Sequence, residues 1–571
     1  MILKALYDYY HRCGDLPKFG TELQAIAFII VIDKEGNFVR IEDKRSKENK
    51  KGVEYLVTKH KTRTSAPKPN HLWDNGKYVL GIDDKGLNSY NTFVDDINRT
   101  CKENPDDQSL KALAKFYSTP YEQIISIIEK DPLWKEIKSM AKLNFALQIE
   151  GDTIIIAERD DLIEAETDKN AKTGTCLITG SKGDIVRLST ATFIPGAQAV
   201  ASLVNMNKGF GYDSYGKLQC YNAPISVDAE FCYSTALKHL LRKDSRNKFY
   251  LGSRTFVFWA SKNDEAGREA EDSIFNLFGF SDAAEDDPNA KIEKVREVFK
   301  GIYSGEIKTT LEDKFYILGL APNSARIAVV YWNECELSDF AKKILKHFDD
   351  MEIVDTRKER RPYYGLRTMM SAITLNGKAQ DVQPNLPEAV MKSMLQDTPY
   401  PYPLFNQCIN RIRAEQGEKQ SVTIARAAII KAYLNRQQNN NNKKIEIMLD
   451  KENINQGYLC GRLFAVLERI QYKAQKNVTI RSRYMNAASA TPAAVFPTLL
   501  NLSLHHFEKL YGEVKEELEQ WEIEILSNIN ADGFPTHLDL QDQGRFFVGY
   551  YHQLQEFHKT KGEETPENKE S

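Results

Sequence analysis

The sequence predicts an α+β protein, in which a mixed N-terminal α/β region is followed by a C-terminal helical bundle. Two observations support this class. Several apolar runs in the first 260 residues are short and bounded by Gly, Asn or Ser, as strands are. After Phe405, apolar residues recur every three or four positions, as on one face of a helix. The length of 571 residues allows about three or four structural units.

The N-terminal region begins with an expected amphipathic helix, because Ile2, Leu6 and Tyr10 share one helical face. Residues 25–32 and 37–41 are expected to form two strands joined by a turn, in which Gly36 supplies a positive φ. The other expected elements are β segments at 78–82 and 145–157, helical stretches near 109–129, and a strand at 254–260. An acidic surface loop is expected at 281–288.

The C-terminal region begins near a group of prolines at positions 399, 401 and 403. Leu459, Leu463 and Leu467 follow the helical spacing. Residues 437–444, rich in Gln and Asn, are expected to link two helices. We therefore predict three regions: an N-terminal α+β region (1–170), a central α+β region that contains an expected motif-reading loop (171–383), and a helical domain (384–571).

The composition gives an expectation about the compartment. The longest apolar run, residues 25–32, is too short to cross a membrane, which takes about 20 residues. The first ten residues lack the pattern of a signal peptide. The eight cysteines form no CxxC pair, which argues against a zinc ribbon and favours reduced, scattered thiols. We expect a cytoplasmic protein that does not contact a membrane.

Motifs of catalysis are absent from the sequence. There is no GxxxxGK[ST], HExxH or GxSxG motif. Lys208 precedes a Gly-Phe-Gly segment, which is more simply an ordinary turn than a phosphate-binding loop. No nucleophile, base and oxyanion site can be assembled from the pattern. The sequence therefore favours a binding protein over an enzyme, with no catalytic residue, metal or cofactor expected.

The charge is nearly balanced overall, with 77 basic and 80 acidic residues, but it is unevenly distributed. Residues 59–68 contain four basic and no acidic residues, residues 172–260 contain 11 and 5, and residues 404–483 contain 15 and 6. Residues 513–524 instead hold six glutamates and one lysine. Such basic segments suit a protein that holds a polyanion on selected surfaces, although ordinary solvated charge explains the counts equally well.

A loop at residues 194–217 combines amides, hydroxyls, aromatics and glycines. Asn and Gln can offer both a donor and an acceptor to base edges, Lys can contact phosphate, and Tyr can stack on an unpaired base. A glycine-rich surface loop with incidental polar residues is the alternative interpretation.

The sequence resembles the Csd-one family, the large subunit of the type I-C CRISPR effector. The matching segments occur in the expected order along nearly the whole chain. They are MILKAL (1–6), FIIVIDKEG (28–36), RTS (63–65), DNGKYVLG (74–81), CLITG (176–180), GAQ (196–198), SYGK (214–217), NAPIS (222–226), TAL (235–237), VFWA (257–260), GRLFA (461–465), AASATP (487–492), QG (543–544) and GYYH (549–552).

This resemblance implies a non-catalytic subunit of Cascade, the crRNA-guided complex that finds invading DNA. The subunit would read the protospacer-adjacent motif on double-stranded target DNA, contact the crRNA handle and the displaced strand, help to form the R-loop, and recruit the helicase-nuclease. The implied partners are crRNA, target DNA, the backbone, crRNA-processing and small subunits of Cascade, and the helicase-nuclease.

The resemblance also guides the choice of site residues. The expected motif-reading residues are Gln198, Asn205, Asn207, Lys208, Asn75 and Lys77. The expected contacts to the nucleic-acid backbone are Arg63, Lys217, Arg462, Arg469, Lys473, Arg481 and Arg483. Arg462, Arg469 and Lys473 share one helical face, for which a solvated helix surface is the alternative interpretation. The sequence departs from the family pattern at Ala199-Val-Ala, where polar residues and glycine are more usual.

Three further hypotheses from the sequence need a test. An internal start at Met448 would yield residues 448–571 as a separate small subunit, which family members commonly produce. The chain could instead be a nucleic-acid enzyme whose active-site residues are dispersed in the sequence. It could also be a structural scaffold that binds only the other protein subunits.

Overall fold

The structure is a computed structural model, and it forms two units that are described separately. The described residues are 2–61, 66–82, 86–163, 171–209, 211, 213, 215–278, 292–356, 365–383, 385–415, 421–437, 443–476 and 480–559. The N-terminal unit comprises Cys13–Thr190 and Met206–Ala236. The C-terminal unit comprises Met1–Arg12, Ala191–Asn205 and Leu237–Ser571.

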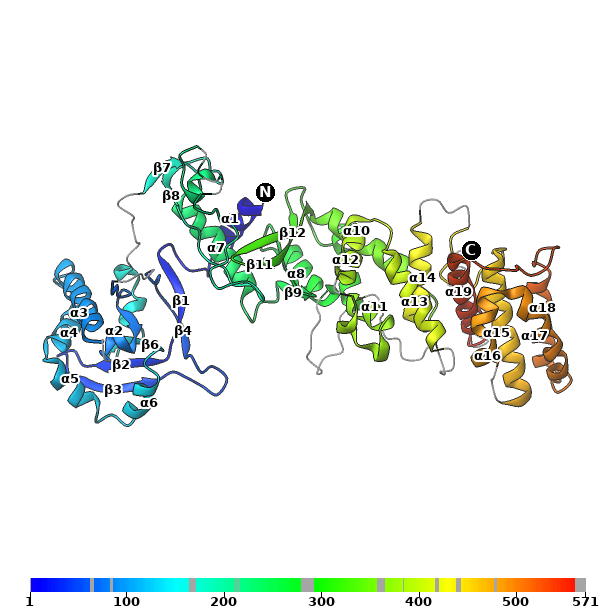
Figure 1. Cartoon of the computed structure of the whole chain (residues 1–571), viewed down its shortest axis with the longest axis horizontal. Coiled ribbons are helices and arrows are strands. Elements are labelled where there is room, and N and C mark those ends of the chain that lie inside the picture. The colour runs from blue at the N-terminus through cyan, green and yellow to red at the C-terminus, as the bar shows by residue number, and fades with distance from the viewer. Residues whose placement is uncertain are drawn as a thin grey trace. The chain divides into compact units, whose positions relative to one another are not determined.

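The N-terminal unit is built on a four-stranded mixed sheet (Figure 1). Its strands, in spatial order, are β3 (Phe38–Asp43), β2 (Phe28–Ile32), β6 (Asn144–Ile149) and β5 (Trp73–Asn75). β2 pairs in parallel with β6, and the other neighbours are antiparallel. All five residues of β2 are buried, as expected for a central strand covered on both faces. Gly36 has φ 78° in the turn before β3, as predicted.

Five helices accompany this sheet. They are α2 (Gly76–Val79), α3 (Gly86–Glu103), α4 (Gln108–Ser118), α5 (Tyr121–Ile128) and α6 (Trp134–Ser139). The helices near 109–129 are confirmed, with a break at Pro120. The prediction of a β segment at 78–82 is wrong, because α2 occupies Gly76–Val79 and no strand follows it among the described residues 80–82. Asn75 caps a short helix there, because its side-chain oxygen accepts a hydrogen bond from the Lys77 amide, 3.1 Å away.

Smaller elements complete the N-terminal unit. β1 (Thr21–Ile26) and β4 (Val53–Thr58) form an antiparallel ribbon, so the apolar run at 25–32 divides between two sheets. β7 (Lys172–Thr175) and β8 (Lys182–Ile185) form a hairpin. Short 3₁₀ helices follow at Ile156–Glu158, Asp160–Leu162 and Gln219–Asn222, so the β segment expected at 145–157 ends at Ile149.

The C-terminal unit begins with an antiparallel sheet of order β12-β11-β10-β9. The strands are β9 (Lys248–Leu251), β10 (Arg254–Ala260), β11 (Lys314–Asn323) and β12 (Arg326–Glu336), so the strand predicted at 254–260 is confirmed. Phe256 and Phe258 join the core that includes residues of α8 (Glu265–Phe278), α9 (Ile292–Ser304) and α10 (Leu337–Met351). Trp259 alternates to the other face and meets Tyr9 of α1 (Ile2–Arg12), with ring centroids 6.2 Å apart.

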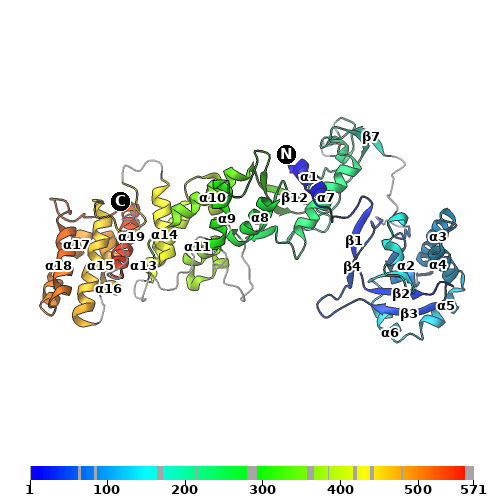
Figure 2. The ribbon, with the colours of Figure 1, turned by 180° about the vertical axis from the view of Figure 1, so that it is seen from behind.

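The remaining helices lie mainly in the C-terminal part of the chain (Figure 2). They are α7 (Val227–Leu241), α11 (Leu366–Ala372), α12 (Leu386–Gln396), α13 (Tyr402–Ala414), α14 (Ile424–Asn435), α15 (Gln456–Gln475), α16 (Ile480–Ala490), α17 (Pro492–Phe507), α18 (Glu513–Leu526) and α19 (Leu540–Glu556). Most of α15 is buried, and it packs closely along α19. The α+β class and the helical C-terminal region are therefore confirmed.

The acidic loop expected at 281–288 lies outside the described residues, and so do residues 438–442 of the link expected between two helices. In the part of the chain that the structure describes, no helix combines the length and apolarity needed to cross a membrane.

Candidate nucleic-acid interface

The first half of the predicted motif-reading loop, residues 191–205, folds onto the hairpin formed by β11 and β12. The amide of Thr192 donates to the carbonyl of Ala201 at 2.7 Å, which closes the loop. The amide of Ile327 donates to the carbonyl of Ser202 at 3.2 Å, which fastens the loop to the hairpin. Gly196 has φ 82°, and a Cβ atom there would lie 3.2 Å from Pro322. The loop is thus an ordered surface element with a fixed anchor.

The tip of the same hairpin positions Gln198. Its backbone amide donates to the carbonyl of Ser324 at 3.1 Å, and its side-chain Nε2 lies 3.3 Å from Ser324 Oγ. The Gln198 side chain remains exposed. Asn205 is half-buried and donates through Nδ2 to the carbonyl of Ala325 at 3.4 Å. Both amides are therefore held at one hairpin, and Gln198 is the better placed to meet a ligand.

The second half of the loop belongs to the N-terminal unit, which begins again at Met206. Asn207, Lys208 and Lys217 are exposed there. Gly209 has φ 79° and nothing within 4 Å of its Cβ position, so the backbone is open to solvent at this point. The predicted motif-reading residues of the loop are thus divided between the two units. Arg63, another predicted contact, lies outside the described residues.

Asn75 and Lys77 line a pocket of about 700 Å³ in the N-terminal unit. The pocket also contains two aromatic residues, Tyr121 and Trp134, and apolar atoms of Ile82, Ile125 and Ala141. Its charged residues are Lys77, Lys138, Lys142 and Glu129, an excess of positive charge. We call this the Trp134 pocket. Asn75 and Lys77 were predicted from the sequence and the aromatic residues were not, although Trp134 and Lys138 are four positions apart, as on one face of a helix. Lys142 lies beyond the end of α6 at Ser139.

Arg462 requires a correction to the predicted path of basic residues. Its side chain is 0% exposed, and it bonds through Nη2 to Glu524 at 3.0 Å and through Nε to Gln553 at 3.1 Å. A guanidinium enclosed and paired in this way presents no charge to a nucleic-acid strand. Its physical role in this structure is to join α15 to α18 and α19.

The other predicted basic residues of the helical region lie near the end of α15 and on α16. Arg469 and Lys473 are half-buried on α15, and the positive charge of Arg469 lowers the pKa of Lys473. A lysine whose pKa falls because of neighbouring cations lies in a region of positive potential. Lys476 adds to this effect and was missed by sequence analysis.

The two arginines of α16 differ in their availability. Arg481 makes an ion pair with Glu468 at 3.4 Å and is 19% exposed in its side chain. Arg483 is exposed, and none of the residues that the structure describes forms an ion pair with it. We call Arg469, Lys473, Lys476, Arg481 and Arg483 the α15–α16 basic cluster. The structure therefore retains four of the five predicted residues of this region as accessible or partly accessible cations.

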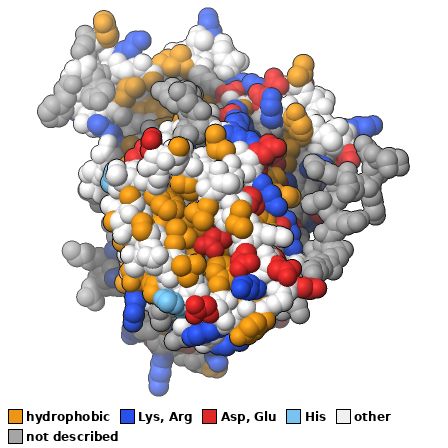
Figure 3. Space-filling model, turned by 90° about the vertical axis from the view of Figure 1, so that its right-hand side faces the viewer, with side chains coloured by type: hydrophobic (Ala, Val, Ile, Leu, Met, Phe, Trp, Pro, Cys, Tyr) orange, Lys and Arg blue, Asp and Glu red, His pale blue; other side chains and the backbone are white. Residues whose placement is uncertain are grey.

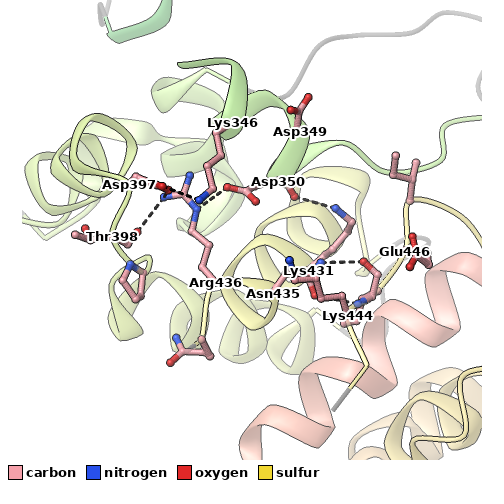
Figure 4. A pocket seen from close by; sticks show the side chains of 14 residues that line it. Lys346, Asp349, Asp350, Asp397, Thr398, Lys431, Asn435, Arg436, Lys444 and Glu446 are labelled. Atoms are coloured by element: carbon pink, nitrogen blue, oxygen red, sulfur yellow. Dashed lines mark hydrogen bonds and ion pairs between the residues drawn. The ribbon is translucent and has the colours of Figure 1, made fainter. Parts of the chain in front are cut away.

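A second pocket, of about 520 Å³, lies between α10, α14 and the segment that precedes α15 (Figure 4). Its four cationic side chains are balanced by four carboxylates. Arg436 donates to the carbonyls of Ser393 and Thr398, each at 2.9 Å, and also pairs with Asp350. Burial lowers the pKa of Lys431, which donates to the Asp350 carbonyl at 3.0 Å. The arrangement is an ion-pair network that fastens elements together, with no net charge to attract a polyanion.

The surface of α17 and α18 has a different character from the basic cluster. Figure 3 views the molecule from the side on which these helices lie in Figure 1, and it shows hydrophobic side chains interspersed with acidic ones. Leu504 on α17 is 63% exposed and Ile523 on α18 is 66% exposed. Since α18 also carries the glutamate-rich segment, this surface is unsuited to a nucleic-acid backbone.

The site contains no recognisable metal centre within the described ranges, where no group of three or more His, Cys, Asp or Glu residues could hold an ion. All eight cysteines are free thiols, and five of them are buried.

The comparisons with known proteins agree with the resemblance seen in the sequence. The family model for CRISPR-associated protein Cas_Csd1 matches residues 6–558. No curated protein matches the sequence. Because the family model spans nearly the whole chain, the protein belongs to the Cas_Csd1 family of CRISPR-associated proteins.

Proposed function

We propose that the chain is the non-catalytic large subunit of a type I-C crRNA-guided DNA surveillance complex. It recognises the protospacer-adjacent motif on target duplex DNA, contacts the crRNA handle and the displaced strand, and helps to form the R-loop. Cleavage belongs to a helicase-nuclease that the complex recruits. The observation that carries the proposal is the family match over residues 6–558, and the exposed cations and amides support it.

The division of labour in such a complex explains why few protein residues need to read sequence. Base pairing with the guide reads the long target, so the protein needs to read only a few base pairs and otherwise contacts backbone. Gln198 is an exposed amide side chain held by hydrogen bonds at the tip of the β11–β12 hairpin, which suits contact with a base edge. Asn205, Asn207 and Lys208 are the other proposed contacts near the motif, and Lys217 is a proposed backbone contact. Asn75 and Lys77 line the Trp134 pocket, and their proposed contact is with an unpaired strand next to the motif or at the handle.

The α15–α16 basic cluster is the proposed contact for single-stranded DNA. Its cations crowd together strongly enough to lower the pKa of Lys473. A phosphate backbone would relieve that repulsion, and the release of its counterions would make binding dependent on salt. Arg462 takes no part in this contact, because it is buried and paired with Glu524.

The proposed internal start at Met448 is compatible with where this residue lies. Met448 is 40% exposed and lies before α15, the first helix of the closely packed group α15–α19. In the full chain, Ile447 accepts a hydrogen bond from Val354 at 2.8 Å, so the segment that precedes Met448 is fastened to the rest of the C-terminal unit. N-terminal sequencing of any shorter product from cells tests this start, and a product that begins elsewhere contradicts it.

The experiment that tests the function uses the crRNA-loaded complex. Binding is measured by mobility shift on matched duplex targets that carry every possible adjacent triplet. The proposal expects strong binding to a small subset of triplets, and no cleavage when the purified chain is incubated with labelled DNA and divalent metals. Equal binding to all triplets would favour a structural scaffold. Metal-dependent cleavage that a point mutation abolishes would establish a nuclease instead.

A further inference from the structure

The Trp134 pocket has the composition of a site for a nucleotide. Its volume of about 700 Å³ lies in the range of small-ligand pockets. Two aromatic side chains and three apolar residues line it together with Asn75 and three lysines. A base requires an apolar or aromatic surface and a few polar partners, and its phosphate requires cations. All of these are present in one pocket of the N-terminal unit.

The two aromatic rings differ in how they are held. Tyr121 packs edge-on against Tyr90, with centroids 5.1 Å apart, and its hydroxyl lies 3.4 Å from the carbonyl of Gly81. Trp134 is half-buried, and no other aromatic ring of the described residues packs against it. Tyr121 therefore forms a fixed wall, whereas the indole of Trp134 offers a surface on which a base can stack.

The lysines leave positive charge available at the pocket. Lys138 and Lys142 are exposed, and within the described chain neither forms an ion pair. The acidic lining residue, Glu129, neutralises one of these two positive charges at most. This excess contrasts with the pocket around Arg436, in which carboxylates balance the cations.

We propose that the Trp134 pocket binds one unstacked nucleotide of a single strand, with its base on Trp134 and its phosphate near Lys138 and Lys142. A base within a duplex is covered by its neighbours on both faces and cannot enter such a pocket. The inference rests on the proposed function for the source of the strand, which is either the guide RNA or one strand of the opened DNA. Both sources share the chemistry of an unpaired base beside a phosphate.

The test titrates the full-length chain with an eight-nucleotide single strand of DNA, the same strand of RNA, and the matching duplex. The chain carries Lys473→Ala and Arg483→Ala throughout, which weaken the other proposed single-strand contact at the α15–α16 basic cluster. Tryptophan fluorescence reports stacking, and fluorescence anisotropy of a labelled strand reports affinity. Single strands should quench the fluorescence of this chain, and the duplex should not. In Trp134→Phe the quenching should disappear while the affinity stays within about threefold, since Phe retains a ring for stacking. Trp134→Ala should weaken binding about tenfold.

Charge variants test the phosphate contact. The double variant Lys138→Ala with Lys142→Ala should weaken binding of the single strand. The slope of log affinity against log salt concentration should decrease by about 0.7 for each lysine removed. Lys135→Ala is the matched control, because Lys135 is exposed on the same helix as Lys138 but does not line the pocket. Glu129→Gln should strengthen binding about twofold, since it removes the opposing charge.

Several outcomes would overturn the proposal. The first is that neither the DNA strand nor the RNA strand quenches the tryptophan fluorescence, or that the duplex quenches it equally. The second is that the quenching persists in Trp134→Phe. The third is that Lys135→Ala weakens binding as much as the Lys138→Ala, Lys142→Ala double variant does. Tighter binding of RNA would assign the nucleotide to the guide, and tighter binding of DNA would assign it to the opened target. The triplet preference of the assembled complex is measured separately, so a failure of this pocket is distinguishable from a failure of the proposed function.

Discussion

Gly461 of α15 and Phe546 of α19 lie so close that a Cβ atom on Gly461 would overlap the carbonyl oxygen of Phe546. Gly549 makes the reciprocal approach, since its Cβ would overlap the carbonyl oxygen of Tyr458. These glycines allow the two helix backbones to pack at short distance. The family segments that begin at 461 and 549 therefore have a structural explanation in helix packing, and neither requires a contact with DNA.

Substitution of Gly461 should destabilise the helical region. Gly461→Ala forces α15 and α19 apart, and overpacking of this kind costs about 1–3 kcal/mol. Urea unfolding followed by circular dichroism measures the decrease in stability. Gly14→Ala is the control, because no atom lies within 4 Å of its Cβ position, and it should change stability by less than about 0.5 kcal/mol. Equal stability of the two variants would contradict the packing explanation.

Arg462 should behave as a structural residue. Arg462→Ala removes a guanidinium from a fully enclosed position and leaves Glu524 without its partner, and breaking a buried ion pair costs about 3–5 kcal/mol. Because the side chain of Glu524 is 29% exposed, we expect about 3 kcal/mol, measured by urea unfolding. Arg483→Ala, at an exposed position on α16, should change stability by less than about 0.5 kcal/mol. A stable Arg462→Ala protein with weakened DNA binding would instead support a place for Arg462 on the path of basic residues.

The error over Arg462 shows what periodicity cannot provide. The spacing of Arg462, Arg469 and Lys473 predicted a shared helical face, and α15 is indeed one helix. Whether that face meets solvent depends on α18 and α19, and the partners Glu524 and Gln553 lie 62 and 91 positions away in the sequence. Spacing within a helix carries no information about such distant partners.

The region near Asn75 shows a related limit. The apolar residues at 78–82 resemble a strand, but the Asn75 cap starts a helix instead. Asn75 and Lys77 were found from a sequence motif, whereas Tyr121 and Trp134 reach the same pocket from other helices. The strand at 254–260 was easier to predict, because its run of apolar and aromatic residues is itself the local signal for a buried strand.

Acid should destabilise the fold through His552. Burial lowers the pKa of this residue from 6.5 to about 3, and its Nδ1 lies 2.9 Å from the hydroxyl of Tyr458. Below pH 6.5, His552 is protonated in the unfolded chain but stays neutral in the folded chain. The free energy of unfolding therefore decreases as the pH falls towards 3. The decrease from this residue between pH 7 and pH 5 should be about 2 kcal/mol.

The comparison that isolates His552 uses a variant that cannot titrate. His552→Asn should lower stability at pH 7, because it disturbs a buried site, but its stability should fall by about 2 kcal/mol less than that of the natural protein between pH 7 and pH 5. The free energy of urea unfolding at both pH values gives this difference. The same decrease in both proteins would show that His552 is protonated in the folded state or that other groups dominate.

Gln198 should affect the discrimination of the adjacent motif. In the assembled complex, Gln198→Ala should weaken binding to the preferred triplet by about 1–3 kcal/mol and leave binding to disfavoured triplets almost unchanged. Ser324→Ala removes the hydroxyl that lies 3.3 Å from Gln198 Nε2, and it should weaken binding in the same way but less, by about 0.5 kcal/mol. Mobility shifts on a triplet series measure both. A uniform decrease in affinity across all triplets would assign Gln198 to backbone contact.

The α15–α16 basic cluster should affect all sequences alike. Replacing Lys473 or Arg483 by Ala should weaken target binding by the complex to a similar degree for every triplet, because phosphates are common to all of them. The slope of log affinity against log salt should decrease by about 0.7 for each single-strand phosphate that the variant no longer neutralises. Lys300→Ala provides the control, since Lys300 is an exposed lysine on α9, outside the cluster. A change of slope as large in the control would show that total charge, and not the position of the cluster, determines binding.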